Sequence, residues 1–440
     1  MALPPRLYLN GRQLAGTRAA NAPVLAPAEL TWGSDGAYEQ PEPDNLKFTL
    51  LFKESMYDVP DLVKGAEVEL LVATSEGWRT LFAGRIRTLS AAPSTRYEGG
   101  LEVTANATSH KADIENAYIS TNWPSGANRV SHLNAAFLAE NWFVYFPENS
   151  QDSAQAVYNS VKLMTMLERY MNRYRGKAFD TSYRGSDGDL RKRLTVMEGS
   201  SRYVKPDQLL ASPPGVWKKT YNSPMISGAP SQILYLPASN ALQDPSWTQD
   251  PDNAITAVTL STMALGDDGF TTQTERNYRA PQAIRDQFGV QSVDFETDLL
   301  NSADWQSAAN DWMTTDSPWK MSELTINDSD LMTEADLADL LANDTRFNTL
   351  IVVTGIMANR PDPGPSDLRS YLLGGTYTWD GKAWAMTLTL ERTITALDGA
   401  GDYWTCQLVG ASANPNIANA TCASVGDTLT VGDFKFIGAP

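Results

Sequence analysis

Histidine and cysteine are scarce in this sequence of 440 residues. The chain has two histidines, His110 and His132, and two cysteines, Cys406 and Cys422, which lie far from the histidines in the sequence. A zinc site or a Cys–His nucleophile pair would have to gather these side chains from distant parts of the chain. We therefore expect no metal site, no cofactor and no catalytic residues, and we interpret His110 as a capping or packing residue.

The two cysteines leave two interpretations open. A disulfide between Cys406 and Cys422 would close a short loop near the C-terminus and contribute up to about 3 kcal/mol to stability. Its formation would depend on exposure to an oxidising environment after assembly. Free thiols are the interpretation that the sequence favours.

Long apolar runs are missing. No run reaches the ~18 residues that are needed to span a bilayer. The stretch from Met1 to Gly16 has a turn where a signal peptide needs its apolar core. We expect a chain that is neither inserted in a membrane nor exported by the usual route.

Catalytic motifs are missing too, since the sequence has no Walker loop, GxSxG elbow, GxGxxG fingerprint or HExxH. Carboxylates are abundant, and one tempting cluster consists of Asp328, Asp330, Glu334 and Asp336. A calcium-binding loop needs Gly and Glu where this sequence has Thr333 and Asp339. We interpret the cluster as the acidic start of a helix.

Positive charge is outweighed by negative charge. The chain has 35 Lys and Arg against 52 Asp and Glu, a net charge of −17, which repels nucleic acid unless charge is strongly segregated. One basic cluster stands out, formed by Arg184, Arg191, Lys192 and Arg193. Because a nucleic-acid patch adds aromatic stacking and a basic domain, we interpret this cluster as a solvated loop or a salt-bridge surface between subunits.

A long β-hairpin is the clearest positive signal. Asp380-Gly381 is typical of a tight turn with left-handed backbone. After the turn, every second residue is large and apolar, at Trp384, Met386, Leu388 and Leu390. This alternation predicts a strand with one buried face.

Short strands are predicted throughout the first hundred residues. Leu7, Leu9 and the turn residues Asn10-Gly11 predict a first hairpin. Further strands are predicted from Lys47 to Phe52, Ala66 to Thr74, Thr80 to Leu89 and Leu101 to Ala107. Strands of this length and spacing favour a small barrel or sandwich.

Helical periodicity begins near residue 112. Val130, Leu133 and Phe137 share one helix face. A second face contains Val161, Met164, Leu167, Met171 and Tyr174. Helices should therefore dominate this region, and the stretch from Trp217 to Pro251 has the composition of a connector.

Strands and helices alternate in the second half. Strands are predicted from Ile255 to Leu260 and from Thr349 to Thr354. Helices are predicted from Ala280 to Phe288, Ser302 to Met313 and Thr333 to Ala342. Residues after Thr395 are richer in Gly, Ala and Asn and read as a short β extension.

Two series of motifs resemble the baseplate hub proteins of long-tailed bacteriophages, also known as minor tail or tail-tip proteins. The N-terminal series is Leu7-Tyr8-Leu9-Asn10-Gly11, Leu30-Thr31-Trp32-Gly33, Pro41-Glu42-Pro43, Leu81 to Ile86 and Ala105 to Asn116. The second series is Ile233 to Pro237 with Trp247, the Phe288-Gly289 turn, and the hairpin from Gly374 to Leu390. Together they cover most of residues 1–396, and their order carries the resemblance.

The resemblance implies a multi-domain α+β fold with two small β-barrels separated by α+β domains. The expected domains are an N-terminal barrel (1–112), an α+β middle domain (113–250), a region that completes the second barrel from Ile255–Leu260 and Thr349–Thr395 (251–396), and a C-terminal extension (397–440). The protein would be a homotrimeric ring in the virion, assembled in the host cytoplasm. Its expected partners are a distal tail or tail-tube protein, the tape measure protein and other tail-tip proteins, with DNA passing through without specific binding.

Two other functions remain open at this stage. A carbohydrate-binding adhesin of the tail tip would use exposed Trp and Asp side chains to recognise the host envelope. A tail-associated cell-wall hydrolase would need converging carboxylates, and scarce histidine and missing motifs argue against it. We expect a structural protein that is not an enzyme.

Overall fold

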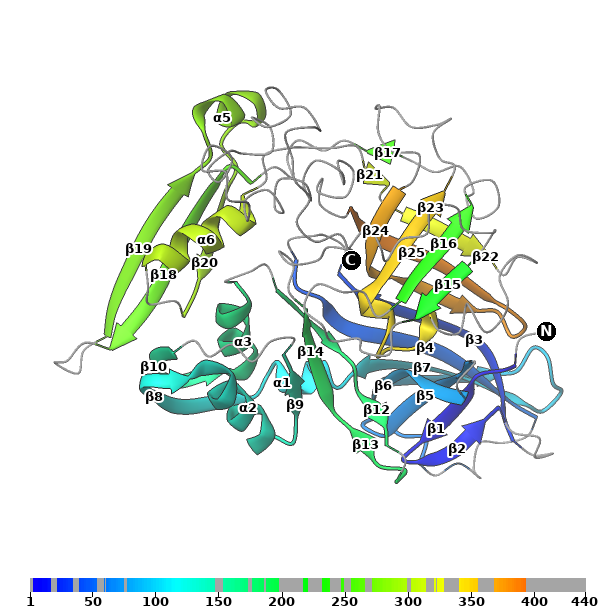
Figure 1. The fold of residues 1–440 in the computed structure, drawn as a ribbon. Helices are drawn as coiled ribbons and strands as arrows, with labels where there is room; N and C mark the ends of the chain where they lie inside the picture. Colours follow the sequence, from blue (N-terminus) through cyan, green and yellow to red (C-terminus); the bar gives the residue numbers. More distant parts are fainter. Residues whose placement is uncertain are drawn as a thin grey trace.

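The structure is a computed structural model. It describes residues 3–16, 22–34, 39–53, 59, 61–74, 77–146, 153–172, 176–185, 187–197, 217–220, 232–237, 247–248, 255–265, 271–298, 302–313, 320–321, 323–327, 340–354 and 368–392. The described part is mostly β, with several sheets and a few short helices (Figure 1). Cys406, Cys422 and the cluster from Asp328 to Asp336 lie outside these residues.

The first hairpin forms as predicted. Asn10 and Gly11 have φ values of 45° and 79°, the left-handed backbone that a primed two-residue turn requires. They join β1 (Arg6–Leu9) to β2 (Arg12–Ala15) in an antiparallel pair. The hairpin then pairs through β1 with β5 (Glu67–Thr74).

The predicted strands of the first hundred residues are confirmed. They are β4 (Glu42–Phe52), β5, β6 (Gly77–Pro93) and β7 (Leu101–Ser109), and β3 (Val24–Gly33) precedes them. In β4, Leu46, Phe48 and Leu50 are buried while Asn45 and Lys47 are exposed. This two-residue period gives the sheet one apolar face.

A second set of strands comes from the other half of the chain. It contains β15 (Trp217–Thr220), β16 (Gln232–Pro237), β22 (Glu323–Asn327), β23 (Thr349–Thr354), β24 (Leu368–Trp379) and β25 (Trp384–Arg392). Both sets belong to one 13-stranded sheet, because β24 pairs with β3. Along its main path the order is β15-β16-β23-β24-β3-β4-β7-β6-β5-β1-β2, with β25 and β22 attached beside β24.

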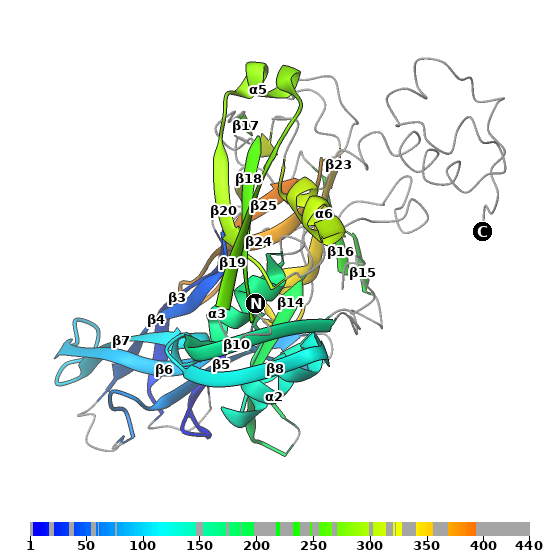
Figure 2. The same cartoon turned by 90° about the vertical axis from the view of Figure 1, so that its left-hand side faces the viewer.

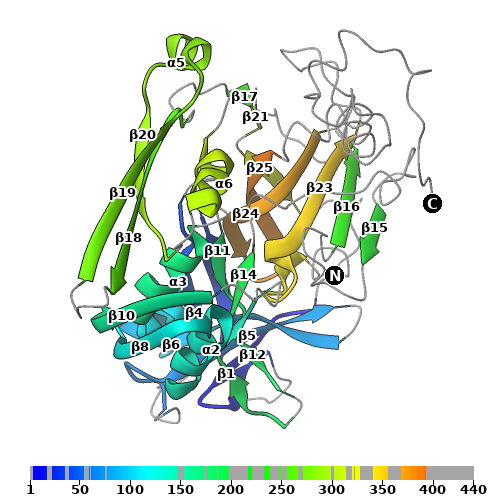
Figure 3. The ribbon, with the colours of Figure 1, turned by 60° about the vertical axis from the view of Figure 1, so that its left-hand side comes forward.

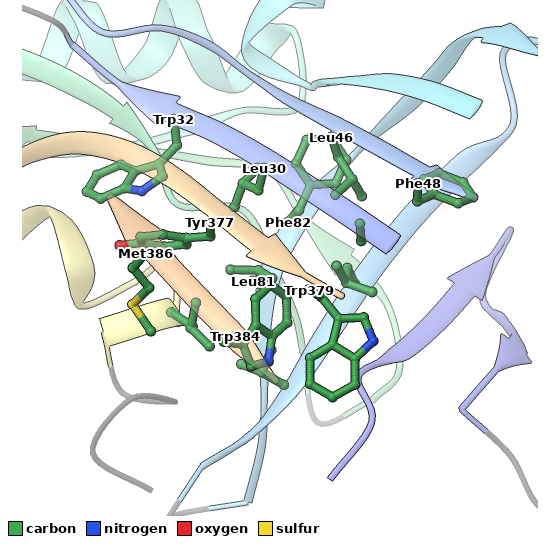
Figure 4. Close-up of a cluster of buried hydrophobic side chains, with 14 of the residues drawn as sticks. Leu30, Trp32, Leu46, Phe48, Leu81, Phe82, Tyr377, Trp379, Trp384 and Met386 are labelled. Carbon is green, nitrogen blue, oxygen red and sulfur yellow. The ribbon is translucent and has the colours of Figure 1, made fainter. Parts of the chain in front are cut away.

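Neither strand set closes into a barrel among the described residues, in contrast to the expectation from sequence. The edge of β3 that a closed first barrel would use is instead paired with β24. The result is a strongly curved, open sheet that runs through both halves of the chain (Figure 3). Its two sets share one core, to which Leu30, Trp32, Leu46, Phe48, Leu81, Phe82, Tyr377, Trp379, Trp384 and Met386 contribute (Figure 4).

The middle region mixes helices with strands. Its elements are α1 (Lys111–Ile114), β8 (Tyr118–Asn128), α2 (Arg129–Ala139), β9 (Phe143–Tyr145), β10 (Ser153–Lys162), α3 (Leu163–Met171), β11 (Lys177–Asp180), β12 (Tyr183–Arg184), β13 (Leu190–Arg191) and β14 (Arg193–Met197). The two predicted helices are confirmed, and Asn128 caps α2 by accepting a 2.8 Å hydrogen bond from the Ser131 backbone N–H. The prediction that helices dominate here is wrong, because the described elements of this region comprise seven strands and three helices.

A separate three-stranded sheet forms an arm. It consists of β18 (Ala257–Leu265), β19 (Thr271–Arg279) and β20 (Ser292–Glu296), with α5 (Gln282–Phe288) at one end (Figure 2). The strand predicted from Ile255 to Leu260 therefore exists, but it belongs to this arm and not to the second strand set. Helix α6 (Ser302–Trp312) packs on the arm, where the Trp312 and Phe295 rings stack at 3.9 Å.

Buried and half-buried polar contacts attach the arm to the middle region. Arg129 at the start of α2 places its Nε 2.7 Å from Asp298 Oδ2, and both side chains are fully buried. Trp312 Nε1 donates a 2.6 Å hydrogen bond to the Asn172 carbonyl.

Smaller elements complete the description. They are the pair β17 (Trp247–Thr248) and β21 (Lys320–Met321) and the 3-10 turn η4 (Arg346–Asn348). Among the described helices, none is long and apolar enough to cross a membrane.

Candidate functional site: a buried charged junction

The seam between β3 and β24 brings the two sequence motifs together. Their register runs from Gly374 opposite Gly33 to Trp379 opposite Ala28. The N-terminal part of β24 pairs with β23 on the same side, so β24 changes partner near a bulge at Leu372 and Gly374. The segment from Leu30 to Gly33 and the Gly374 hairpin are thus hydrogen-bonded neighbours.

Glycine is required where the two strands meet. Gly33 has φ of +83°, and a Cβ on it would lie 2.2 Å from the Leu373 carbonyl oxygen. A Cβ on Gly374 would lie 2.6 Å from the Trp32 carbonyl oxygen. These distances are too short for a side chain, so the sequence Trp32-Gly33 and the pair Gly374-Gly375 allow the backbones to approach.

Arg346 lies under this seam. Its NH2 donates a 2.6 Å hydrogen bond to Asp44 Oδ2, and its NH1 donates one of 2.9 Å to the Leu81 carbonyl. The guanidinium also lies 4.4 Å from the centre of the Trp32 ring, a cation–π contact. One side chain from the second half of the chain therefore binds three groups of the first strand set.

Asp44 is buried, and this raises its pKa to about 7, while the Arg346 charge acts in the opposite direction. Burial penalises the ionised carboxylate because the interior solvates charge poorly. Its backbone N–H is satisfied by a 3.1 Å hydrogen bond to Ser109 Oγ.

The middle region joins the same junction through Lys111. Its backbone N–H donates a 3.0 Å hydrogen bond to Asp180 Oδ2, and its Nζ donates to the Ala178 carbonyl at 3.2 Å and to the Pro41 carbonyl. Burial lowers the pKa of Lys111. Ser182 in turn donates to Asp180 Oδ1 from its backbone N–H at 2.9 Å. The buried network Asp44, Arg346, Lys111 and Asp180, which we call the charged junction, thus binds three parts of the chain together.

The basic cluster found in the sequence is divided among different contacts. Arg184 Nε donates a 3.0 Å hydrogen bond to Glu69 Oε2, and its guanidinium lies 4.9 Å from the Tyr8 ring centre. Arg191 pairs with Asp187 at the exposed end of the β12–β13 hairpin. Arg184 is therefore an internal link to the first strand set, which corrects its interpretation as a solvated or intersubunit residue.

His110 is a packing residue, as the sequence predicts. It is buried at the start of α1, and its Nδ1 lies 3.4 Å from Asp113 Oδ2, with no capping hydrogen bond from its side chain. Hydrogen bonds from His110 and Arg87 lower the pKa of Asp113.

The second histidine, His132, is half-buried on α2. Within the described ranges, no group of three or more His, Cys, Asp or Glu side chains is placed to hold a metal ion.

Sequence reasoning missed the charged junction. Asp44 and Arg346 have no motif, and their polar character in the sequence suggests exposed positions. The one available signal is indirect, since Asp44 occupies an inward position in the alternation of β4 that continues with Leu46 and Phe48. The role of the junction is structural, because Arg346 pairs with Asp44, the Lys111 ammonium donates to backbone carbonyls and Asp180 accepts from backbone N–H groups.

Fold and junction together define a mostly β protein in which two strand sets form one sheet around buried charges. Solved structures similar to it include a tail protein from Neisseria meningitidis MC58, 12% identical with a TM-score of 0.48, over 89% of this chain and 96% of that one. The 43 kDa tail protein of prophage MuSo2 from Shewanella oneidensis is 9% identical, with a TM-score of 0.48 over 88% of this chain and 98% of that one.

A third similar structure is a component of the type VI secretion system of E. coli, itself described as similar to the T4 phage tail proteins gp27 and gp5. It is 8% identical, with a TM-score of 0.45 over 88% of this chain and 76% of that one. No protein-family model and no curated protein matches the sequence. These matches cover most of this chain.

Proposed function

We propose that this chain is the structural hub of a phage tail tip or baseplate. It forms a homotrimeric ring that joins the tail tube to the tip and surrounds part of the DNA ejection channel. The observation that carries the proposal is the β3–β24 seam. There, the segment from Leu30 to Gly33 and the Gly374 hairpin, which resemble hub proteins in the sequence, become adjacent strands of one sheet.

The seam and the charged junction suit this role mechanically. Each copy has two strand sets, one within residues 1–112 and one made of β15, β16 and β22 to β25, and a ring of three copies presents six such units. A ring that meets a six-fold tube in this way needs a constant angle between the two units of a copy. A continuous sheet with a buried Asp44–Arg346 pair across the units supplies that rigidity.

Partners follow from the position in the ring. We propose contacts with a distal tail or tail-tube protein, with the tape measure protein and with other tip proteins, in a virion assembled in the host cytoplasm. DNA passes through without specific binding, which a net charge of −17 favours because basic contacts to phosphate would add affinity and slow the genome. Residues 397–440 are a separate extension in this proposal.

The two alternative functions receive less support. The adhesin hypothesis relies on exposed Trp side chains, but Trp32, Trp305, Trp312, Trp379 and Trp384 are each at most 6% exposed. A hydrolase needs carboxylates that converge on a substrate, whereas Asp44 and Asp180 are bound by Arg346 and by Lys111 and Ser182. We propose a role without enzymatic activity.

Electron microscopy of purified tails tests the proposal. Labelled antibody or a fused density marker on this chain is expected to appear at the tip, as a three-fold ring on the end of the tube. Two-fold symmetry, or a location along the tube or on the fibres, would contradict the hub assignment. Release of sugar or peptide fragments from purified cell walls by the pure chain would contradict the non-enzymatic role.

A further inference from the structure

The arm and the middle region have separate apolar cores. In the middle region, α2 and α3 contribute Phe137 and Leu167 to one buried cluster. In the arm, β18 and α6 contribute Leu260 and Trp305 to another. The middle region also reaches the main core of the large sheet through Phe179, whereas none of the described arm residues belongs to that core. The arm is therefore a folded unit with a core of its own.

The joint between these two units is largely polar. Arg129 of α2 places its Nε 2.7 Å from Asp298 Oδ2, and its Nη2 donates a 3.0 Å hydrogen bond to the Asp298 carbonyl. Arg169 of α3 donates a 2.7 Å hydrogen bond from Nε to Glu296 Oε2, and Asn172 Nδ2 donates one of 2.9 Å to the Glu296 carbonyl. Strands β10 and β18 also lie side by side. These hydrogen bonds and ion pairs meet the arm at the end of β20 and just after it.

The Arg129–Asp298 pair is the part of the joint that is removed from water. Both side chains are 1% exposed, whereas Glu296 is 52% exposed and its pair with Arg169 is partly solvated. A buried ion pair fixes an orientation but contributes little net free energy, because both charges lose their hydration when they meet. Separation of the joint returns that hydration. It therefore costs less than separation of an apolar joint of the same size, which would expose apolar surface to water.

We propose that the arm is a movable lever and that Arg129 and Asp298 form the latch that fixes it against the middle region. Polar interfaces between folded units of one chain commonly permit relative motion of those units. In the latched state the two charges are paired. In the released state they are hydrated, the contacts of Glu296 with Arg169 and Asn172 are broken, and the arm keeps its own core. This device operates within one copy of the chain and does not depend on the hub proposal.

Pulsed electron spin resonance tests the latch by measuring the distance between two spin labels in one copy. The labels are attached at Ala135→Cys on α2 and Ser292→Cys on β20, which are both exposed positions. The background is the full-length chain with Cys406→Ser and Cys422→Ser, and an excess of unlabelled chain suppresses distances between copies. With the latch intact, the distribution of distances should be single and narrow. A broad distribution in this chain would mean that the pair does not fix the arm.

Asp298→Asn keeps the shape of the side chain but removes the carboxylate that pairs with Arg129. Because the arginine charge then reaches water only when the arm moves away, a second distance should appear, with a population at least about tenfold above that of the intact latch. Asp187→Asn is the matched control, since it removes an exposed pair with Arg191 in the same region and should leave the distribution unchanged. The double variant Arg129→Ala, Asp298→Ala removes both charges and should release the arm less than Asp298→Asn.

Amide hydrogen exchange separates release of the arm from its unfolding. The paired segments 257–261 and 275–279 of β18 and β19 lie inside the arm, and their amides should stay protected in Asp298→Asn. Loss of that protection along with the appearance of the second distance would mean that the arm melts, which overturns the lever. A distribution in Asp298→Asn that matches the one in Asp187→Asn would show that the pair is not a latch, and it would leave the hub proposal intact.

Discussion

Arg346 and Asp44 are 302 residues apart in the sequence and form an ion pair of 2.6 Å with almost no exposure to solvent. The contact joins the second half of the chain to the first beneath the β3–β24 seam. A buried pair of this kind contributes little net stability compared with apolar residues of similar volume, but it is costly to break. The pair therefore favours the orientation of the two strand sets in which both charges are satisfied.

Removal of the Arg346 side chain should therefore destabilise the protein. At pH 8, where Asp44 is ionised, Arg346→Ala leaves a buried carboxylate without its partner, and the free energy of unfolding should fall by about 3 to 5 kcal/mol. Urea denaturation measures this change. Arg85→Ala, which loses partly exposed contacts with Glu67 and Asp113, should cost about 1 kcal/mol or less. Similar losses in both variants would contradict the special role of the junction.

Asp44 should make stability depend on pH. Its pKa is raised from 3.8 to about 7 in the folded protein by burial, so the folded state holds the proton more tightly than the unfolded state. This contribution is complete below pH 3.8 and is lost as pH rises through 7, amounting to a loss of about 2 to 3 kcal/mol between pH 5 and pH 8.

The comparison that isolates this effect uses Asp44→Asn. As pH rises from 5 to 8, the free energy of unfolding of the wild type should fall relative to that of the variant. A difference that stays constant with pH, or shifts in favour of the wild type, would show that Asp44 remains ionised in the fold.

The Trp384 strand offers a test of packing. Trp384, Met386, Leu388 and Leu390 are all buried, whereas Thr387 on the opposite face is half-buried. Trp384→Ala removes a large side chain that packs against Trp379 at 5.4 Å between ring centres, and it should cost about 3 to 5 kcal/mol. Thr387→Ala should change the unfolding free energy by about 0.5 kcal/mol or less. Equal effects of the two substitutions in thermal or urea unfolding would contradict the assigned strand phase.

Local features of this fold are predictable from sequence because their causes are local. The turn at Asn10-Gly11 requires two residues that tolerate positive φ. In the loop of residues 380–383 only Gly381 has positive φ, so the two-residue turn expected at Asp380-Gly381 is wrong, whereas the alternation that follows it reflects one buried face. The helix from Arg129 begins at an asparagine that can cap it. Such signals identify an element and its buried side.

Partners between elements are harder to predict. The alternation of Val258 and Leu260 predicts a strand, yet nothing in it distinguishes the arm from the second strand set. The closed barrels were a wrong expectation for the same reason, since the choice of β24 as partner for β3 depends on the close approach of Gly33 and Gly374. The charged junction was not predictable either, because isolated polar residues carry no periodic signal.

Gly33 provides the sharpest test of the seam. Its φ of +83° is unfavourable for residues with a side chain, and a Cβ would lie 2.2 Å from the Leu373 carbonyl oxygen and 2.4 Å from the Gly374 Cα. Gly65 has a similar φ of +88°, but a Cβ there has nothing within 4 Å. Gly65→Ala therefore measures the backbone strain alone, about 1 to 2 kcal/mol.

Gly33→Ala adds the steric clash to that strain, and the backbones of β3 and β24 must separate to relieve it. We expect a loss of unfolding free energy at least twice that of Gly65→Ala, together with faster amide hydrogen exchange in residues 28–33 and 374–379, the paired segments of the seam. Exchange that accelerates equally throughout the chain would indicate general destabilisation. If both variants lose the same free energy and the seam stays protected, the close contact between Gly33 and Gly374 does not limit how the two strand sets join.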